Sequence, residues 1–344
     1  MTNKTKNLIR ILLSAGTAIS LYFVPWLLVK AWILPLPDTV QEQLDEAIGH
    51  GFEGMLVYID QGGQPPQPLA AGWHNRETKV PAKPEALFKI ASISKLYDAV
   101  AVTKLVSAGR LSLDKTIADY LPALAGKIEN AEKITLRLMI QHKSGIPNFT
   151  DTPNFWAAPT ATFEESLALI AGLPANFEPG EGYEYCNTNY LLLNKIMDDV
   201  LGYGNFQFIQ EEVLTPLNLT NTFASLAEVD TANVMSGYHV GYSKDLKTND
   251  HGMHATAANV ATFVRALNDG SVFGPGEKEI YASVYEFKHG GWVPGYQSFA
   301  EYYEDIDAVV VAFYSTTDSD LYNWNLSEII NSRIVKILKK KQRS

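Results

Sequence analysis

Segments typical of β-strands gather at the two ends of this sequence, and that separation restricts the fold more than any other feature. Near the start, "FEGMLVYID" from Phe52 and "QPLAAGW" from Gln67 flank the Gly- and Pro-rich turn "QGGQPPQ". Near the end, "IYASVYEFKHGG", "YQSFAEYYED" and "AVVVAFYST" are aromatic and β-branched, like three strands of a meander. Strands from both ends must therefore meet in one sheet.

The stretch between these strands, about residues 110–275, has the signals of helices divided by proline-rich loops. One more helix is expected before the first strands, in "LPLPDTVQEQLDEAIGHG", and another after the last, in "LYNWNLSEIINSRIVKILKK". The sequence therefore predicts an α+β fold, with an antiparallel sheet flanked by N- and C-terminal helices and an inserted helical subdomain. A site would form naturally in the crevice between the two parts.

The amino terminus contains an uncharged run over residues 11–29, "ILLSAGTAISLYFVPWLLV", which three basic residues and no acid precede. About twenty apolar residues suffice for a helix to cross a bilayer, and the basic residues favour a cytoplasmic amino terminus. The alternative is a cleaved signal peptide, but "VKAWILPLP" follows and offers no small-x-small cleavage site. We therefore expect residues 1–37 to form a cytoplasmic stub, a transmembrane anchor and a linker.

Residues 38–344 would then form the functional domain, on the periplasmic side of the inner membrane. The formal net charge of the chain is -10, although the first ten and last twelve residues together carry nine positive charges and no acid. The rest of the chain therefore carries -19, which makes it a poor binder of nucleic acid.

Cysteine and histidine usage argues against a metal or cofactor. Cys186 is the single cysteine, so neither an intramolecular disulfide nor a cysteine-based zinc site is possible within the chain. His251 and His254 in "HGMH" are a weak metal pair, and no H-E-x-x-H motif occurs. We expect no bound metal and no cofactor.

Two Ser-x-x-Lys pairs occur, Ser92 with Lys95 in "FKIASISKLYDAVAV" and Ser112 with Lys115 in "GRLSLDK". A serine hydroxyl is a weak nucleophile, and a lysine can act as its base if burial lowers the lysine pKa. The residues from Ser94 onward are apolar nearly all round, which predicts a buried helix with the first pair at its amino-terminal end. The second pair follows a glycine turn, where the serine is expected to be a local cap.

A lysine base needs a partner, and a tyrosine is one solution. Two Tyr-x-Asn triplets occur, "YCN" at Tyr185 and "YGN" at Tyr203. The second lies in a Gly-flanked turn and is expected to be structural. The first lies in "PGEGYEYCNTNYLLLNKIM", a loop that turns into a helix at its asparagines, and it is the better candidate.

Three blocks in this order resemble the serine β-lactamase and penicillin-binding protein superfamily, in its branch of class C β-lactamases, D-Ala-D-Ala carboxypeptidases and esterases. "SISK" resembles S-x-x-K, "YCN" resembles Y-x-N, and "HGGWVPGY" from His289 resembles the third block, H-x-G or K-T-G. "LRLMIQHKSGIPNF" and "PLNLTNTF" also fit, so the resemblance covers roughly residues 40–335. It implies a β-lactamase/transpeptidase-like fold.

The resemblance also implies roles for the first two blocks. Ser92 would be the acylated nucleophile, and Lys95 and Tyr185 would share the general base and acid work. Asn187 would hydrogen-bond the substrate amide or Lys95. Cys186 stands where serine is commoner in the triplet, and it is expected to be a small buried residue rather than a second nucleophile.

In the third block, the resemblance places His289 and Gly291 on the strand beside the site. The oxyanion hole would be formed by the N–H groups of Ser92 and Trp292. A second frame is open, because Lys288 begins a K-x-G triplet, and neighbours on a strand face opposite ways. The later glycine spacing favours His289 as the residue that enters the site.

We therefore predict a membrane-anchored extracytoplasmic serine hydrolase that forms an acyl-enzyme on esters, D-amino-acid peptides or β-lactams. Its partners would be a small-molecule or peptidoglycan-peptide substrate and the membrane, through the N-terminal helix. The alternative is a catalytically silent relative that binds cell-wall peptides or serves as a scaffold. None of the three blocks is broken, which favours the enzyme.

Overall fold

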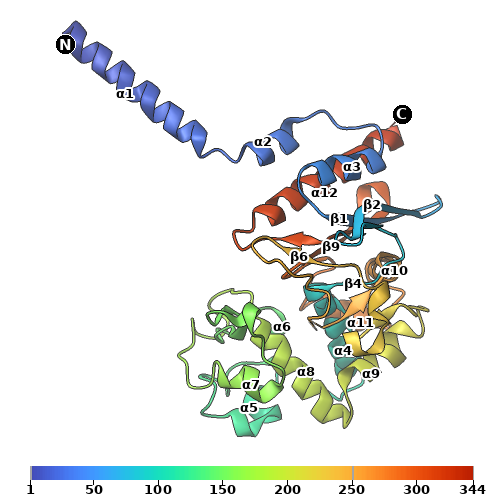
Figure 1. The fold of residues 1–344 in the computed structure, drawn as a ribbon. Coiled ribbons are helices and arrows are strands. Elements are labelled where there is room, and N and C mark those ends of the chain that lie inside the picture. The colour runs from blue at the N-terminus through green and yellow to red at the C-terminus, as the bar shows by residue number, and fades with distance from the viewer. Residues whose placement is uncertain (1, 250–251, 344) are drawn as a thin grey trace.

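The computed structural model describes residues 2–249 and 252–343, and its centre is a six-stranded antiparallel sheet (Figure 1). The strand order is β3-β2-β1-β10-β9-β8. The strands are β1 (Gly54–Gln61), β2 (Gln67–Asn75), β3 (Val80–Pro81), β8 (His289–Val293), β9 (Tyr296–Tyr303) and β10 (Ala308–Tyr314). Strand β1 pairs with β10, so the two ends of the chain meet in one sheet and the predicted fold class is confirmed.

Each strand presents alternate residues to the two faces of the sheet, because side chains alternate along a strand. On β10, Val309, Val311 and Phe313 belong to the larger hydrophobic core, which lies on the face toward the middle of the chain. Val310 and Ala312 belong to a smaller core on the opposite face. All of these side chains are buried, so the sheet is a two-sided layer rather than a solvent-exposed surface.

The terminal helices cover the smaller core, as predicted. They are α3 (Val40–Gly49) and α12 (Tyr322–Arg343), and α2 (Trp26–Ile33) packs on α12. Arg333 of α12 is almost fully buried and donates to Gln43 Oε1 (2.6 Å) and to the carbonyl of Leu34 (2.7 Å). A buried guanidinium needs such acceptors, so this residue fixes α12 against α3 and the linker before it.

The other face of the sheet is covered by α10 (Ala257–Asp269), with α4 (Ser94–Ser107) and α11 (Glu277–Ala282) packed beyond it. Ten of the 14 residues of α4 are buried, which confirms the prediction of a central helix. Tyr97 of α4 stacks on Phe263 of α10 with ring centroids 3.6 Å apart. The amino-terminal end of α4 is thereby held beside the edge of the sheet.

A separate helical lobe fills most of the middle of the chain (Figure 1). Its helices and the neighbouring ones are α5 (Ile117–Tyr120), α6 (Leu136–Ile140), α7 (Phe163–Ala168), α8 (Asn187–Leu201) and α9 (Asn205–Ile209). Short strands also occur: β4 (Phe88–Lys89), β5 (Thr222–Phe223) and β7 (His254–Ala255) form one small sheet, and β6 (Tyr238–His239) pairs with β11 (Thr316–Thr317). The predicted domain limits stay a prediction, and α10, inside the range 110–275, lies on the main sheet.

One predicted strand begins at an earlier residue than the strand in the structure. The expected strand beginning at Ile280 is instead the end of helix α11, and β8 begins only at His289. Gly276 precedes the helix as its N-cap with φ +78°, and two glutamates stand in the first turn, where the helix dipole favours them. Tyr281 is fully buried in the larger core, so tertiary packing uses aromatic residues here in a helix.

The amino-terminal run is also broken differently from the prediction. Helix α1 (Asn3–Tyr22) ends before Pro25, and α2 begins after it. Within residues 2–249 and 252–343, no single helix has both the length and the hydropathy of a membrane span. Helices α1 and α2 reach the length and hydropathy of a span only when taken together, and a bend of 76° separates them. The expected single helix over residues 11–29 is therefore wrong, because proline lacks the N–H that would continue α1.

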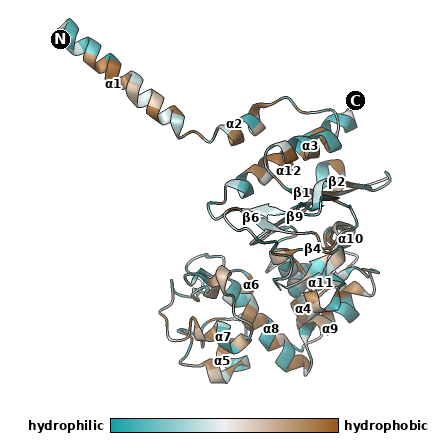
Figure 2. Cartoon of the chain, viewed as in Figure 1, coloured by the Kyte–Doolittle hydropathy of each residue, from teal (hydrophilic) through white to brown (hydrophobic). Residues whose placement is uncertain are grey.

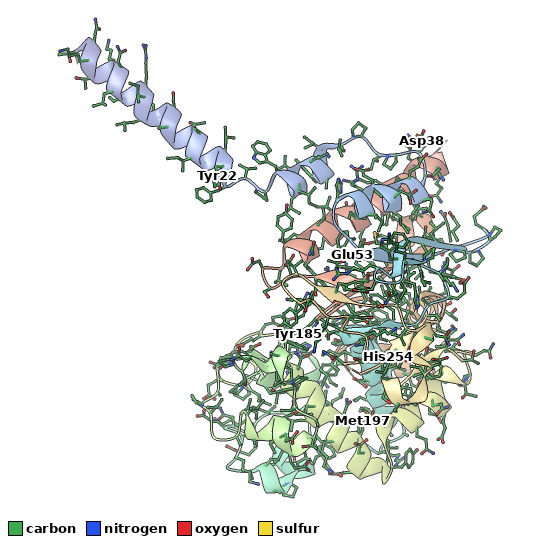
Figure 3. The ribbon with its side chains drawn as sticks, in the orientation of Figure 1. Tyr22, Asp38, Glu53, Tyr185, Met197 and His254 are labelled. Atoms are coloured by element: carbon green, nitrogen blue, oxygen red, sulfur yellow. The ribbon has the colours of Figure 1, made fainter. Side chains whose placement is uncertain are left out.

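Helix α1 has no buried residue, and Figure 3 shows its side chains projecting away from the rest of the chain. Figure 2 shows strongly apolar stretches on α1 and α2. Exposed apolar side chains at the junction of these helices include Tyr22 (82% exposed) and Phe23 (75%). These side chains therefore belong to neither hydrophobic core of the described residues.

Candidate active site

Ser92 lies in a short 3-10 helix, Ala91–Ile93, that runs directly into α4. The chain turns sharply before it, with Ala91 at φ +49°, in the left-handed region that favours glycine. Strand β8 lies close against this turn: a Cβ added to Gly291 would be 2.4 Å from the carbonyl oxygen of Ile90. Glycine at position 291 therefore permits the close approach of β8 to the serine.

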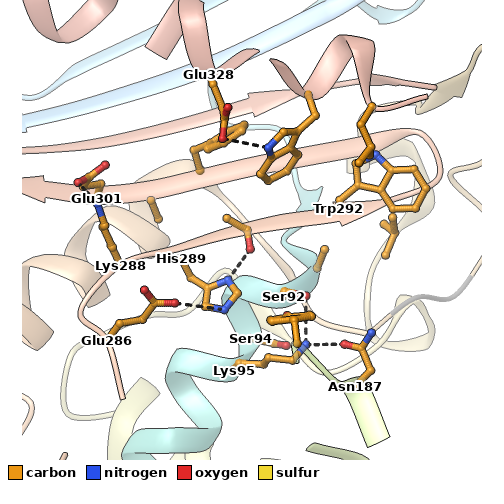
Figure 4. A pocket seen from close by; sticks show the side chains of 18 of the residues that line it. Ser92, Ser94, Lys95, Asn187, Glu286, Lys288, His289, Trp292, Glu301 and Glu328 are labelled. Atoms are coloured by element: carbon orange, nitrogen blue, oxygen red, sulfur yellow. Dashed lines mark hydrogen bonds and ion pairs between the residues drawn. The ribbon is translucent and has the colours of Figure 1, made fainter. Parts of the chain in front are cut away.

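Lys95 lies one turn after Ser92 and is 6% exposed. Its Nζ donates to Ser92 Oγ (3.0 Å) and to Asn187 Oδ1 (2.9 Å), as the dashed lines of Figure 4 show. Asn187 is the first residue of α8, and its Nδ2 donates to Thr150 Oγ1 (3.0 Å). The structure thus brings together three predicted residues. Ser92 lies just before α4 and Lys95 lies in its first turn, whereas Asn187 comes 92 residues after Lys95 in the sequence.

Tyr185 faces Lys95 with its ring, and Lys95 Nζ lies 5.2 Å from the ring centroid. Tyr190 presents its ring to the same ammonium at 5.3 Å. The Tyr185 hydroxyl is buried and has no hydrogen-bond partner among the described residues, so it is not bonded to Ser92 or Lys95. The structure places the predicted tyrosine at the site but does not place its oxygen in a hydrogen bond with the serine–lysine pair.

His142 was not singled out from the sequence, although it lies in the quoted stretch "LRLMIQHKSGIPNF". Its ring stacks on Tyr185 with centroids 4.4 Å apart, and its Nδ1 accepts from the backbone N–H of Cys186 (3.1 Å). Burial first, and then the charges of Lys95 and His289, lower the pKa of His142 to about 3. His142 is therefore neutral, and it holds the Tyr185 loop by accepting a hydrogen bond.

The third block enters the site with His289. The side chain of His289 is 8% exposed, and its ring centroid lies 6.1 Å from that of Tyr185. Burial first, and then the charge of Lys95, lower the pKa of His289 to about 4, so the imidazole is neutral near pH 7. Lys288 faces the other way and pairs with Glu301 at 2.6 Å, so the structure selects the His289 frame.

Trp292 is positioned so that its backbone N–H can serve a ligand. Val293 and Tyr296 close the two-residue turn of the β8–β9 hairpin, and they are the positions that the hydrogen bond of such a turn joins. Pairs of this kind alternate along the ladder, so the N–H of Trp292 points away from β9, at the edge of the sheet. Its side chain meets Trp156 of the helical lobe edge-on, with centroids 5.7 Å apart.

The second serine–lysine pair has no comparable surroundings. Ser112 Oγ accepts from the backbone N–H of Asp114 (3.4 Å), which is the local turn expected for it. Lys115 is exposed and lies 5.7 Å from the centroid of the Tyr120 ring. The pair therefore lies in a surface turn, as predicted.

The remaining candidates are structural in the described part of the chain. Cys186 is buried, and its thiol points to the carbonyl of Ile146 (3.3 Å). His254 is buried in β7, whereas His251 lies outside the described residues. Across residues 2–249 and 252–343, no three His, Cys, Asp or Glu side chains lie close enough to hold a metal ion.

These features define a class: a β-lactamase/transpeptidase-like fold with a buried Ser-x-x-Lys pair beside the edge strand of its sheet. The chain belongs to the Beta-lactamase family, whose model matches residues 36–284. The match covers the first two blocks and confirms the predicted superfamily. It ends before β8 and therefore does not include the third block.

Two curated relatives are Protein flp of Staphylococcus aureus (strain COL) and Penicillin-binding protein 4* of Bacillus subtilis (strain 168). The first is 26% identical over 211 residues, which cover 60% of this chain and 42% of the relative. The second is 28% identical over 189 residues, which cover 54% of this chain and 40% of the relative. The chain thus spans less than half the length of these relatives.

Solved structures share the fold over most of the chain. D-amino acid amidase from Ochrobactrum anthropi SV3, in complex with L-phenylalanine amide, aligns with a TM-score of 0.77 at 20% identity and covers 88% of this chain and 98% of its own. A penicillin binding protein from Bacillus halodurans aligns with a TM-score of 0.72 at 19% identity, over 85% and 99% of the two chains. EstCE1, a hydrolase with promiscuous acyltransferase activity, gives a TM-score of 0.66 at 20% identity, over 89% and 98%.

Proposed function

We propose that this chain is a serine hydrolase that works through an acyl-enzyme. The observation that carries the proposal is the hydrogen-bonded series from Ser92 Oγ through Lys95 Nζ to Asn187 Oδ1, buried at the start of a helix. Lys95 Nζ would accept the Ser92 proton as Oγ attacks the substrate carbonyl. The N–H groups of Ser92 and Trp292 would bind the oxyanion.

The second half of the reaction returns the proton. As the bond from the carbonyl carbon to the leaving oxygen or nitrogen breaks, Lys95 or Tyr185 would protonate the leaving group. Water would then attack the acyl-enzyme, lose a proton to the same groups, and release the acid and free Ser92. The Tyr185 hydroxyl has no competing partner among the described residues, which suits it to bond a substrate group.

We infer that the preferred substrates are esters or D-amino-acid peptides rather than β-lactams. In the resembling family, dedicated β-lactamases usually place a lysine at the position of His289, where it supplies a cation for the carboxylate of the drug. His289 is neutral, because burial and Lys95 lower its pKa to about 4, so it offers a hydrogen bond without full charge. The likeness to a D-amino acid amidase is consistent with amide substrates but concerns the fold alone.

The test is kcat/KM of the purified full-length chain for p-nitrophenyl butyrate, a D-Ala-D-Ala peptide and nitrocefin. We expect the ester or the peptide to be the better substrate. If nitrocefin is the best substrate by tenfold or more, the charge argument is wrong and the chain acts as a β-lactamase.

We also propose that α1 and α2 anchor the protein in the inner membrane, with the rest of the chain on the extracytoplasmic side. The support is the exposed apolar surface of α1 and the length and hydropathy that the two helices reach together. Amino-terminal sequencing of membrane-fraction protein, with protease added from outside the inner membrane, tests this. A mature chain that begins after residue 29 would identify a cleaved signal peptide instead.

A further inference from the structure

The cavity at Ser92 continues past strand β8 onto the opposite face of the sheet. It has a volume of about 1550 Å³, more than the roughly 300–1,000 Å³ usual for a small-molecule site. Its second part, which we call the α12 groove, lies between α12 and the sheet. The groove is lined on its apolar side by Phe299, Val310, Ala312, Trp324 and Val335.

The two parts of the cavity meet at β8, which is the edge strand of the sheet. Gly290 and Gly291 are consecutive in β8, so two positions of this edge strand carry no side chain. Trp324 lies directly over the first of them, since a Cβ added to Gly290 would be 2.8 Å from its ring. Figure 4 shows Ser92 and Lys95 on one side of the strand, and Trp292 and Glu328 on the other. Because residues on both sides of β8 line one cavity, an elongated substrate bound at Ser92 can extend around this edge strand into the groove.

The walls of the α12 groove suit an uncharged hydrocarbon chain. Phe299 and Trp324 pack at 4.6 Å between ring centroids and form an aromatic wall. Several charged groups at the rim are already engaged: Glu328 accepts from the Trp324 indole (3.0 Å), and Lys339 pairs with Asp305 (2.7 Å). An apolar chain gains free energy by leaving water for such a surface, and it needs no polar partner there.

We infer that the α12 groove binds the medium-length acyl chain of an ester or amide whose carbonyl lies at Ser92. The inference rests on the proposed hydrolase function and names its substrate class. Ser92 Oγ forms the new bond to the carbonyl carbon, and the bond to the leaving alcohol or amine breaks as that group takes up the proton. The acyl chain stays in the groove on the acyl-enzyme until water releases it as the acid.

The kinetic test fills the groove from its exposed side. Ser332 is an exposed residue of α12 that lines the cavity, so Ser332→Trp should plug the groove without disturbing the core. Asn325→Trp is the matched control, since Asn325 is exposed on the same helix and does not line the cavity. Lys336→Trp, also exposed and lining, is a second plug if the first variant fails to fold.

We expect kcat/KM of the unmodified chain to be at least tenfold higher for p-nitrophenyl octanoate than for the acetate. Ser332→Trp should lower the octanoate value at least fivefold and leave the acetate value within twofold, and Asn325→Trp should leave both within twofold. Equal values for the two esters in the unmodified chain would overturn the inference. An unchanged octanoate preference in both plugged variants would overturn it too.

A binding measurement separates this inference from the proposed chemistry. Ser92→Ala protein is titrated calorimetrically with octanamide and acetamide, with and without Ser332→Trp. Octanamide binding that Ser332→Trp abolishes supports the groove even if no ester is hydrolysed, in which case the hydrolase proposal alone fails. Hydrolysis of short esters without octanamide binding leaves the hydrolase proposal intact and overturns the groove.

Discussion

The two Ser-x-x-Lys pairs share one spacing and differ in everything around it. Lys95 is buried at the start of a central helix, and its Nζ lies 3.0 Å from Ser92 Oγ. Lys115 is exposed, and it lies beside a surface turn that Ser112 caps. The first pair also has a third partner, Asn187, whose Oδ1 accepts from the lysine. Burial and a distant partner therefore distinguish the candidate catalytic pair from the surface pair, whereas the spacing is the same in both.

Removing the two hydroxyls should give the largest contrast. Ser92→Ala should lower kcat/KM for the best substrate about a thousandfold or more, because the acyl-enzyme can no longer form. Ser112→Ala should leave it within twofold, since that hydroxyl only caps a turn. Initial rates are measured for both variants once each has been shown to keep the melting temperature of the unmodified chain. Equal losses of kcat/KM in the two variants would show that the two pairs do not differ in function.

Removing the two amines should give the next largest contrast. Lys95→Met should cost about a hundredfold or more, the usual scale of general acid–base catalysis, because its length is kept and its nitrogen is lost. Lys115→Met should have no measurable effect on rate. A Lys95→Met protein that keeps more than a tenth of the activity would show that another group activates Ser92.

Acid should destabilise the surroundings of the first pair. His142 has a folded pKa of about 3, below the unfolded value near 6.5, so between these values the unfolded chain binds more protons. Its contribution to stability is complete above about pH 6.5 and falls as the pH drops toward 3. The difference in unfolding free energy between pH 7.5 and pH 5 should be about 1–2 kcal/mol smaller in His142→Gln.

Urea unfolding at both pH values, for the unmodified chain and the variant, measures that difference. The comparison of the two proteins removes the contributions of other titrating groups, among them Asp98, whose pKa burial raises to about 7. An identical pH dependence in both proteins would mean that His142 titrates normally in the folded state.

The smallest effect is expected at His289. His289→Lys replaces a neutral hydrogen-bond donor by a charged one, which is worth about 1 kcal/mol, or several-fold in rate, toward a carboxylate-bearing β-lactam. The ratio of kcat/KM for nitrocefin to that for p-nitrophenyl butyrate should rise accordingly. Lys288→Ala is the control, since Lys288 pairs with Glu301 and faces away from the serine. A fall in the ratio for His289→Lys would reject the charge argument.

Much of the fold follows from local pattern in the sequence. Strands β1, β2, β9 and β10 could be predicted, because β-branched and aromatic residues are concentrated there between clear turn signals. The early strand at Ile280 was wrong because tertiary packing buries Tyr281 from a helix. The continuous helix over residues 11–29 was wrong because α1 ends at Tyr22 and Pro25, which has no N–H, stands before α2.

The candidate site was only partly readable. Ser92 and Lys95 are neighbours through the helix period, so their contact follows from sequence. Asn187 was located through the resemblance, whereas His142 and Trp156 were not singled out at all. Both act through long-range contacts, the first with Tyr185 and the second with Trp292, and no local pattern encodes those contacts.

The most direct test of the account is the position of a covalent adduct. The full-length chain is treated with a fluorophosphonate or a fluorescent penicillin, digested, and mapped by mass spectrometry. The account predicts an adduct on the peptide that contains Ser92, retained in Ser112→Ala and lost in Ser92→Ala. An adduct on the Ser112 peptide, or labelling that survives Ser92→Ala, would contradict it. No adduct with either probe would favour a catalytically silent relative.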